Sequence, residues 1–387
     1  MSFVSEKSKQ TPRSVIREMF SMQTGLEDVV SFALGEPDFV APEHVIEATV
    51  SSFRRGETHY TPNAGIPALR EAVSKEYQKR GLSYQPNEIL IGAGAISILC
   101  LACTAILDVG SEVLLPDPGW ANYKGLIIQV GAVPVPVKVY EKNGFIFDPE
   151  DLRRAITPRT KMILINSPAN PTGGVASAER LRQIADLAKE KDLYILTDEI
   201  YNALLWDEEP YASIAGFDGM KERTIIVDGF SKKYAMTGFR LGWGAGPEEV
   251  ISAMTKLLEN MLSSVNEGVQ WGGVAALTGD QNCVEEMKRQ YRRRRRLMVE
   301  GLNAIDKISC QEPKGAFYAF ANITATGLTS RDFAIRLLQE KHTVVVPGTG
   351  FGEGGEGFIR LSYATSEENI KEGLRRIREF VSGLFQK

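Results

Sequence analysis

The strongest constraint on the fold is an alternation of short apolar runs with longer helix-like segments between residues 87 and 227. The segments between the runs, such as residues 97–107 and 178–190, place apolar residues at the i, i+3, i+4 spacing of an amphipathic helix. Because strand–helix–strand units build parallel sheets, the alternation predicts an α/β domain with a mostly parallel sheet. The strand-like runs cover residues 89–91, 112–115, 162–165, 193–196 and 224–227.

The sequence after residue 246 follows a different pattern. Helical periodicity runs from residue 248 to about residue 305, and a second helix is expected over residues 367–385. Short strands are expected at residues 316–321, 344–346 and 358–361. An irregular order of strands and helices is typical of an α+β domain.

The length of 387 residues exceeds the roughly 100–200 residues of one domain, so two domains are expected. We predict a large domain over residues 41–280 and a small C-terminal domain over residues 281–387. Residues 1–40 are expected to form an N-terminal arm and to complete part of the small domain.

The composition argues against several classes of function. A formal net charge of -4 creates no overall field that favours nucleic acid. The three histidines show no metal-ligand spacing, so no metal site is expected. Cys100 and Cys103 lie in an apolar helical segment, where core packing is favoured over metal or redox chemistry.

Residues 1–10 lack the apolar core of a signal peptide, and no run of about 18 apolar residues occurs in the chain. These features predict a cytoplasmic protein that makes no membrane contact.

Arginine occupies every position from residue 292 to residue 296. Consecutive positions on a helix point most of the way around its axis, so the run does not form a single basic stripe. A solvated or partner-facing helix is therefore favoured over a nucleic-acid patch.

Small and polar residues follow each predicted strand of the parallel sheet. Because the carboxyl ends of parallel strands share one edge, these groups are expected to converge on one crevice. Lys232 at such an end can form an imine, and the guanidinium of Arg240 can hold a phosphate, a combination that suggests pyridoxal phosphate. Taken alone, Lys232 and Lys233 can equally belong to a solvated loop. The strand-end segments are residues 92–95, 116–120, 166–173, 197–201 and 230–232.

From about Thr11 to Ser362 the chain resembles the class I aminotransferases of the aspartate aminotransferase superfamily. The motifs that carry the resemblance are residues 170–173 (Asn-Pro-Thr-Gly), Asp198-x-x-Tyr201, and Ser231-Lys232 followed by Arg240, in the order of the family. The resemblance implies a large α/β domain with a mostly parallel seven-stranded sheet sandwiched by helices, plus a smaller α+β domain. It also implies pyridoxal 5′-phosphate as the cofactor.

The resemblance implies three catalytic residues. Lys232 would form the internal aldimine and then carry a proton, and Asp198 would keep the pyridine nitrogen protonated. Tyr201 would donate a hydrogen bond to the cofactor's phenolate oxygen. Further cofactor contacts are implied for Gly94, Ala95, Ile96, Trp120, Asn170, Ser231 and Arg240. Taken singly, Asp198 and Asn170 are also typical turn residues, and Trp120 is compatible with ordinary packing.

Gly229 departs from the family pattern, because a phosphate-binding serine often stands at that position. One hydroxyl is therefore missing from the expected phosphate site. The contacts of Arg240 are expected to outweigh that loss, since charge-assisted hydrogen bonds are stronger than neutral ones.

The resemblance also implies how the substrate and a second subunit are bound. Arg360 would grip the substrate α-carboxylate, with Asn170 and the backbone of Gly35 beside it. Tyr60 would reach across a homodimer interface to the partner's cofactor phosphate. On sequence alone, Gly35 is a turn glycine and Tyr60 is a surface tyrosine in a turn.

We therefore expect a pyridoxal-phosphate-dependent aminotransferase that works by a ping-pong aldimine/ketimine mechanism. The donor is expected to be an L-amino acid, aromatic or broad in range and possibly aspartate, and the acceptor a 2-oxo acid, 2-oxoglutarate by preference. A C–S β-lyase and an aminotransferase for N-acetyl-diaminopimelate-type substrates stay open on the same scaffold, as does a non-enzymatic binding protein. No arginine can be assigned from the sequence to a distal carboxylate.

Overall fold

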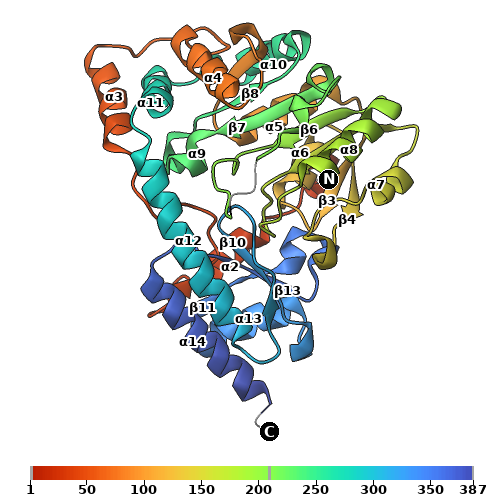
Figure 1. Ribbon diagram of the computed structural model, residues 1–387, viewed down its shortest axis with the longest axis vertical. Helices are drawn as coiled ribbons and strands as arrows, with labels where there is room; N and C mark the ends of the chain where they lie inside the picture. Colours follow the sequence, from red (N-terminus) through yellow and green to blue (C-terminus); the bar gives the residue numbers. More distant parts are fainter. Residues whose placement is uncertain (1–2, 208–210, 386–387) are drawn as a thin grey trace.

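The computed structural model describes residues 3–207 and 211–385. A seven-stranded sheet forms its largest element, with the strand order β2-β8-β7-β6-β5-β3-β4 (Figure 1). Strands β3 to β7 run parallel to one another, whereas β8 is antiparallel to both of its neighbours, β2 and β7. The mostly parallel α/β sheet is therefore confirmed. The strands are β2 Ile89–Gly92, β3 Glu112–Asp117, β4 Val133–Lys138, β5 Thr160–Asn166, β6 Tyr194–Asp198, β7 Thr224–Gly229 and β8 Gly242–Ala245.

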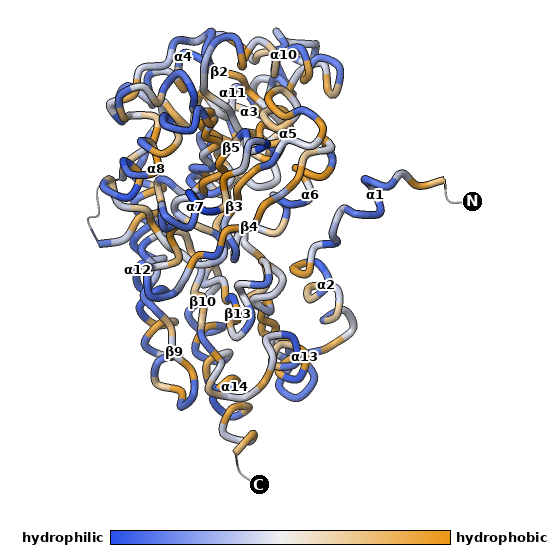
Figure 2. The backbone as a smooth tube through the Cα atoms, turned by 90° about the vertical axis from the view of Figure 1, so that its right-hand side faces the viewer, coloured by the Kyte–Doolittle hydropathy of each residue, from blue (hydrophilic) through white to orange (hydrophobic). Residues whose placement is uncertain are grey.

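The strands are apolar on both sides because helices cover both faces of the sheet. In β2, Leu90 packs into one apolar cluster, while Ile89 and Ile91 pack into the cluster on the opposite face. Figure 2 shows that β3 and β5 are hydrophobic, whereas α8 is more hydrophilic. The helices of one face are α5 Ala95–Ile106, α6 Asn122–Gln129 and α10 Glu248–Leu262. The other face carries α4 Pro67–Lys79, α8 Ala178–Glu190 and α11 Glu267–Thr278, with α3 Glu43–Arg54 packed on α11 and α7 Pro149–Ala155 on α8. We call this sheet with its helices the large-sheet body.

Two strands of the sheet have no counterpart in the sequence prediction. Strand β4 alternates valine with Pro134 and Pro136, and proline is tolerated there because β4 is an edge strand. Strand β8 contains Gly242, at which a Cβ atom would lie 2.5 Å from the backbone nitrogen of Ala95. This glycine lets β8 approach the start of α5.

A second group of elements, the small-sheet body, is built on the four-stranded sheet β12-β13-β10-β9. Its neighbouring strands are antiparallel. Helix α12 Asn282–Asn303 runs from the large-sheet body to this one (Figure 1). The small-sheet body comprises β9 Ser309–Cys310, β10 Tyr318–Asn322, α13 Ser330–Lys341, β12 Val346–Pro347, β13 Phe358–Ser362 and α14 Glu367–Leu384.

The N-terminal segment joins the small-sheet body. Strand β1 Val30–Ser31 pairs in parallel with β11 Thr343–Val344, and α2 Val15–Met22 contacts β12. Helix α1 Glu6–Gln10 lies at the outside of the molecule (Figure 2). The strand expected at residues 344–346 is thus divided between two sheets. The domain boundaries at residues 40 and 280 stay a prediction.

The arginine run of residues 292–296 lies within α12 and is only partly solvated. Arg292, Arg293 and Arg296 are exposed, whereas Arg294 and Arg295 are buried. Arg294 pairs with Asp38 at 2.7 Å, and Arg295 pairs with Asp207 at 2.6 Å. The prediction of a solvated run is wrong at these two positions, because the helical period places them on the inner face beside Tyr291. None of the helices within residues 3–207 and 211–385 is long and apolar enough to cross a membrane.

A buried ion-pair network ties α4 to the ends of two central strands. Arg80, the residue that follows α4, contacts Glu199 at 2.5 Å and Asp228 at 3.1 Å. Asn202 donates a hydrogen bond to Asp228, and Ser213 donates one to Glu199. Burial raises the pKa of Asp228 to about 7, although the charge of Arg80 opposes this shift.

We predict that Arg80→Met lowers the free energy of unfolding by about 3–5 kcal/mol, because it leaves buried carboxylates without their cation. Loss of the Arg80 charge should raise the pKa of Asp228 further. The native state of the variant would then bind more protons than its unfolded state over a wider pH range. Stability should therefore fall as the pH rises from about 5 to 8. Urea unfolding at about pH 5 and about pH 8 measures the free energy of unfolding of the variant and of the wild type.

Arg55→Met is the matched control, because Arg55 forms an exposed ion pair with Glu57. If Arg80→Met and Arg55→Met both lowered the free energy of unfolding by a similar small amount at every pH, the proposed stabilising contribution of the Arg80 network would be contradicted.

Candidate active site

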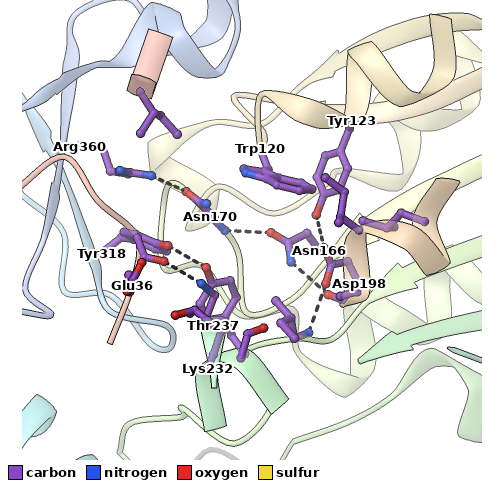
Figure 3. Close-up of a pocket in the computed structure, with 18 of the residues that line it drawn as sticks. Glu36, Trp120, Tyr123, Asn166, Asn170, Asp198, Lys232, Thr237, Tyr318 and Arg360 are labelled. Carbon is purple, nitrogen blue, oxygen red and sulfur yellow. Dashed lines mark hydrogen bonds between the residues drawn. The ribbon is translucent and has the colours of Figure 1, made fainter. Parts of the chain in front are cut away.

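A cavity of about 580 Å³ lies where the carboxyl ends of β5, β6 and β7 face the small-sheet body (Figure 3). It brings together most of the residues expected from the sequence. These are Gly35, Ala95, Ile96, Trp120, Asn170, Asp198, Tyr201, Ser231, Lys232, Arg240 and Arg360. The convergence arises because parallel strands end at one edge of the sheet.

Lys232 belongs to the short helix α9 Phe230–Lys233, which begins directly after β7. Its Nζ donates a hydrogen bond to the backbone oxygen of Gly35 at 2.7 Å. Burial lowers the pKa of the Lys232 amine to about 8; the charge of Glu36 opposes the shift and that of Arg240 adds to it. A substantial fraction of the amine is therefore neutral near pH 7.5. Lys233 instead pairs with Glu76 at 2.8 Å, outside the cavity.

Asp198 ends β6 and is held by two donors. The hydroxyl of Tyr123 donates to its Oδ2 at 2.7 Å, and the backbone nitrogen of Ile200 donates to its Oδ1 at 3.2 Å. Burial raises the pKa of Asp198 to about 6, against the effect of these hydrogen bonds. The carboxylate is therefore largely ionised above neutral pH.

Asn166 fixes the two strand-end segments relative to each other (Figure 3). Its side-chain amide donates to the backbone oxygen of Asp198 at 3.0 Å and accepts from the backbone nitrogen of Asn170 at 2.8 Å. Asn166 stands opposite Asp198 in the parallel pairing of β5 with β6.

Arg360 is fully buried in β13 and makes only neutral contacts. Its guanidinium donates to Asn170 Oδ1 at 3.2 Å and to the backbone oxygen of Ala33, and it lies over the ring of Tyr318 at 4.7 Å. Its Nε has no hydrogen-bond partner. Within the described part of the chain, Arg360 has no carboxylate partner. A buried cation of this kind is suited to bind an anionic ligand.

The start of α5 forms an anion cradle with Arg240. Gly94 caps the helix at a φ of 79°, and a Cβ atom at that position would lie 2.6 Å from Arg240 Nη2. Ala95 and Ile96 follow in the first turn, where backbone N–H groups lack helical partners. Gly94 itself stands behind the cavity surface, against Arg240. At Gly229, a Cβ atom would lie 3.0 Å from the Cα atom of Gly242, so strand packing there leaves little room for a side chain.

These groups fit pyridoxal phosphate. The cavity offers an amine of lowered pKa, a buried carboxylate, an anion cradle and the indole of Trp120. It also holds the hydroxyl of Tyr201, which lies 2.7 Å from that of Tyr318. Each group of the cofactor therefore has a residue of matching chemistry, although the roles of these residues stay predictions.

Tyr60 does not line the cavity of its own chain, and 86% of its surface is exposed. Its expected contact with a partner's cofactor stays a prediction.

Several cavity residues were given no individual role by the sequence analysis. Asn166 lies in the strand-end segment 166–173 that was expected to reach the crevice, but only Asn170 was singled out there. Tyr123, Tyr318 and Arg17 lie in helices or in the other body, where no local signal pointed to the site. The further cavity residues that were not singled out are Ile16, Glu36, Leu99, Thr237 and Gly238, together with Ile200 of the expected strand-end segment 197–201.

The sequence matches the family described as aminotransferase class I and II over residues 27–377. It is 41% identical to an aspartate aminotransferase of Pyrococcus horikoshii, over 98% of both chains. It is 40% identical to aromatic-amino-acid aminotransferase 2 of Thermococcus litoralis, over 97% of both. The structure of an aspartate aminotransferase from Thermus thermophilus with maleate superposes with a TM-score of 0.93 and 40% identity, covering 98% of this chain and 100% of that one.

We predict that acetylation of Lys232, in protein prepared without cofactor, increases with pH and inflects near pH 8, because only the neutral amine is nucleophilic. Lys233 serves as the internal control, since its pKa is raised and its labelling should increase only at higher pH. Pulsed acetic anhydride labelling, followed by mass spectrometry of the peptide, measures both rates. Parallel pH profiles for the two lysines would contradict the lowered pKa.

Proposed function

Because the chain belongs to the class I and II aminotransferase family, we propose that it uses pyridoxal 5′-phosphate to transfer an amino group from an L-amino acid to a 2-oxo acid. The observation that carries the proposal is the convergence of Lys232, Asp198 and Arg360 on one cavity. An amine, a carboxylate and a guanidinium that no carboxylate of the described residues neutralises are the groups that the reaction requires on the protein side.

Pyridoxal phosphate, when bound, supplies a carbonyl carbon that reacts with amines and a protonated ring that withdraws electrons. Lys232 would tether the cofactor, and its amine, whose pKa is lowered by burial, would carry a proton as general acid and base. The Asp198 carboxylate, oriented by Tyr123, would hold a proton on the ring nitrogen. Tyr201 and Asn170 would donate hydrogen bonds to the cofactor's phenolate oxygen.

Phosphate binding is assigned to the cradle at the start of α5. Arg240 provides the charge there, the backbone of Gly94, Ala95 and Ile96 provides the N–H groups, and Ser231 provides a hydroxyl. Trp120 covers the ring face.

Arg360 anchors the substrate through its α-carboxylate. A carboxylate would give this buried guanidinium the anionic partner that the described residues do not provide. Asn170 orients the guanidinium through its side-chain oxygen, and the Gly35 segment lies beside Lys232. Every donor carries an α-carboxylate, so this contact is common to all of them.

We propose a donor range that is aromatic or broad and extends to aspartate, with 2-oxoglutarate as acceptor. The support is the mixture of aspartate and aromatic aminotransferases among the relatives, together with the apolar side chains of Ile16 and Leu99 and the aromatic ring of Tyr318 around the cavity. Release of pyruvate and ammonia without an acceptor would instead favour the C–S β-lyase alternative. Turnover restricted to acylated diaminopimelate would favour an aminotransferase for N-acetyl-diaminopimelate-type substrates.

We further propose a cytoplasmic homodimer in which Tyr60 contacts the partner's cofactor phosphate. The exposure of Tyr60 supports this arrangement, because the hydroxyl is free to meet a second chain.

Lys232→Ala should abolish the half-reaction. The wild-type protein loaded with pyridoxal phosphate should lose its visible absorption band when tyrosine or aspartate is added, and regain it with 2-oxoglutarate. The variant should be slower by at least about 10²–10⁴-fold, because the proton carrier is missing. Lys233→Ala, altered outside the cavity, is the control and should behave as wild type. Full activity of Lys232→Ala would refute the assignment.

Arg360→Ala should reduce kcat/KM for aromatic and dicarboxylic donors alike, by a barrier increase of about 2–5 kcal/mol, because every donor loses its α-carboxylate partner. Steady-state kinetics with tyrosine and aspartate measure this. A loss confined to dicarboxylic donors would show that Arg360 binds a different carboxylate.

A further inference from the structure

Tyr318 is a buried cavity residue to which the proposed reaction assigns no role in chemistry. It is the first residue of β10 in the small-sheet body, and it lines the same cavity as Lys232 and Arg360 (Figure 3). Its hydroxyl lies 2.7 Å from the hydroxyl of Tyr201, which follows β6 of the large sheet. This hydrogen bond therefore joins the two bodies inside the cavity.

The proposed reaction fixes the direction of this hydrogen bond. Each hydroxyl carries one proton, and burial raises the pKa of both Tyr201 and Tyr318, so both stay protonated near neutral pH. In the proposed reaction Tyr201 donates its proton to the phenolate oxygen of the cofactor, and its own oxygen can then only accept from Tyr318. Tyr318 is thus the first donor in a chain of two hydrogen bonds, and the bonds of such a chain strengthen one another.

The ring of Tyr318 supports the guanidinium of Arg360. In the antiparallel pairing of β10 with β13, Arg360 stands opposite Phe320, two residues after Tyr318. Since residues two apart share a face of the sheet, Tyr318 and Arg360 are diagonal neighbours on one face. The guanidinium lies 4.7 Å from the centroid of the Tyr318 ring and 4.9 Å from that of Phe351. Both contacts stabilise the cation without neutralising its charge, so it stays available to a carboxylate.

A third contact of Tyr318 is with the segment that holds Lys232. A Cβ atom at Gly35 would overlap the Tyr318 hydroxyl, so the absence of a side chain at Gly35 lets this hydroxyl reach Tyr201. The backbone oxygen of Gly35 accepts the hydrogen bond from Lys232 Nζ. Tyr318 therefore contacts Tyr201 and Arg360 directly and packs against the residue that binds the amine.

We propose that Tyr318 is a positioning residue with two separable effects: its hydroxyl orients Tyr201 toward the cofactor's phenolate oxygen, and its ring holds the Arg360 guanidinium in place for the substrate carboxylate. The inference rests on the proposed aminotransferase function. The two effects can be separated because phenylalanine supplies only the ring and leucine supplies neither group.

Tyr318→Phe tests the hydroxyl. Without its donor, Tyr201 should bind the phenolate oxygen less strongly, and the more basic oxygen should let the cofactor chromophore keep its proton to a higher pH. The pH midpoint of the visible absorption band, measured on protein loaded with pyridoxal phosphate, should rise by about 0.4–1 pH unit, the equivalent of one hydrogen bond. Calorimetric binding of the monocarboxylate 3-phenylpropionate to protein prepared without cofactor should not change, because the ring is retained.

A double-variant cycle separates this effect from a change in packing. In protein that already carries Tyr201→Phe, the Tyr318 hydroxyl has no phenol to orient, so adding Tyr318→Phe should leave the midpoint unchanged. The midpoint also depends on the charged groups that face Lys232, and neither substitution alters them. These groups are Glu36, Arg240, Arg360 and Asp198.

Tyr318→Leu tests the ring. It should weaken binding of 3-phenylpropionate by about 2- to 30-fold, the range of a cation–π contact, because the guanidinium loses the ring that holds it. Tyr363→Phe is the matched control. The buried Tyr363 hydroxyl accepts from Trp206 and donates to the backbone oxygen of Ala316, but Tyr363 does not line the cavity. The control should leave both the midpoint and the binding constant unchanged.

An unchanged midpoint in Tyr318→Phe would overturn the role of the hydroxyl. An equal shift in the wild-type and Tyr201→Phe backgrounds would also overturn it, since the effect would then reach the cofactor by another route. Equal binding of 3-phenylpropionate by Tyr318→Leu and wild type would overturn the role of the ring. If the wild type took up no pyridoxal phosphate, the proposed function itself would fall, whereas the binding comparison without cofactor would still report on Tyr318 and Arg360.

Discussion

The active site depends on the parallel register of β5, β6 and β7. Asn166 stands opposite Asp198, so β5 and β6 end at one level of the sheet, and Asp198 stands opposite Val227, from which β7 continues only to Gly229. The strand register alone therefore brings the side chains that follow the strand ends to one edge of the sheet. Asn166 reinforces the register by bonding to the backbone of both neighbouring segments.

Burial then adjusts the acid–base properties of the groups on this edge. The same loss of hydration lowers the pKa of Lys232 to about 8 and raises that of Asp198 to about 6. Between these values the carboxylate is mainly ionised and a part of the amine is neutral, which is the combination that proton transfer requires. On the other side of the strand ends, Arg80 neutralises buried carboxylates that would otherwise repel one another.

The small-sheet body supplies Arg360, the residue that we propose anchors the substrate. Arg360 comes from β13, and helix α2, which also lines the cavity, packs on the neighbouring strand β12. The large-sheet body contributes the amine, the carboxylate and the anion cradle. The residues to which we assign chemistry and recognition thus lie on different sheets that meet at one cavity, where Asn170 links the two through its contact with Arg360.

The sequence by itself determined five of the seven strands of the large sheet, all but β4 and β8, and with them the strand-end residues Asp198 and Lys232, because apolar periodicity is a local property. Family resemblance added Arg360. Only the tertiary structure decided that Tyr123 orients Asp198, that Arg294 is buried, and that Arg17 faces the cavity. Each of these depends on contacts between segments far apart in the chain, and neither local periodicity nor motif spacing records which distant side chains meet.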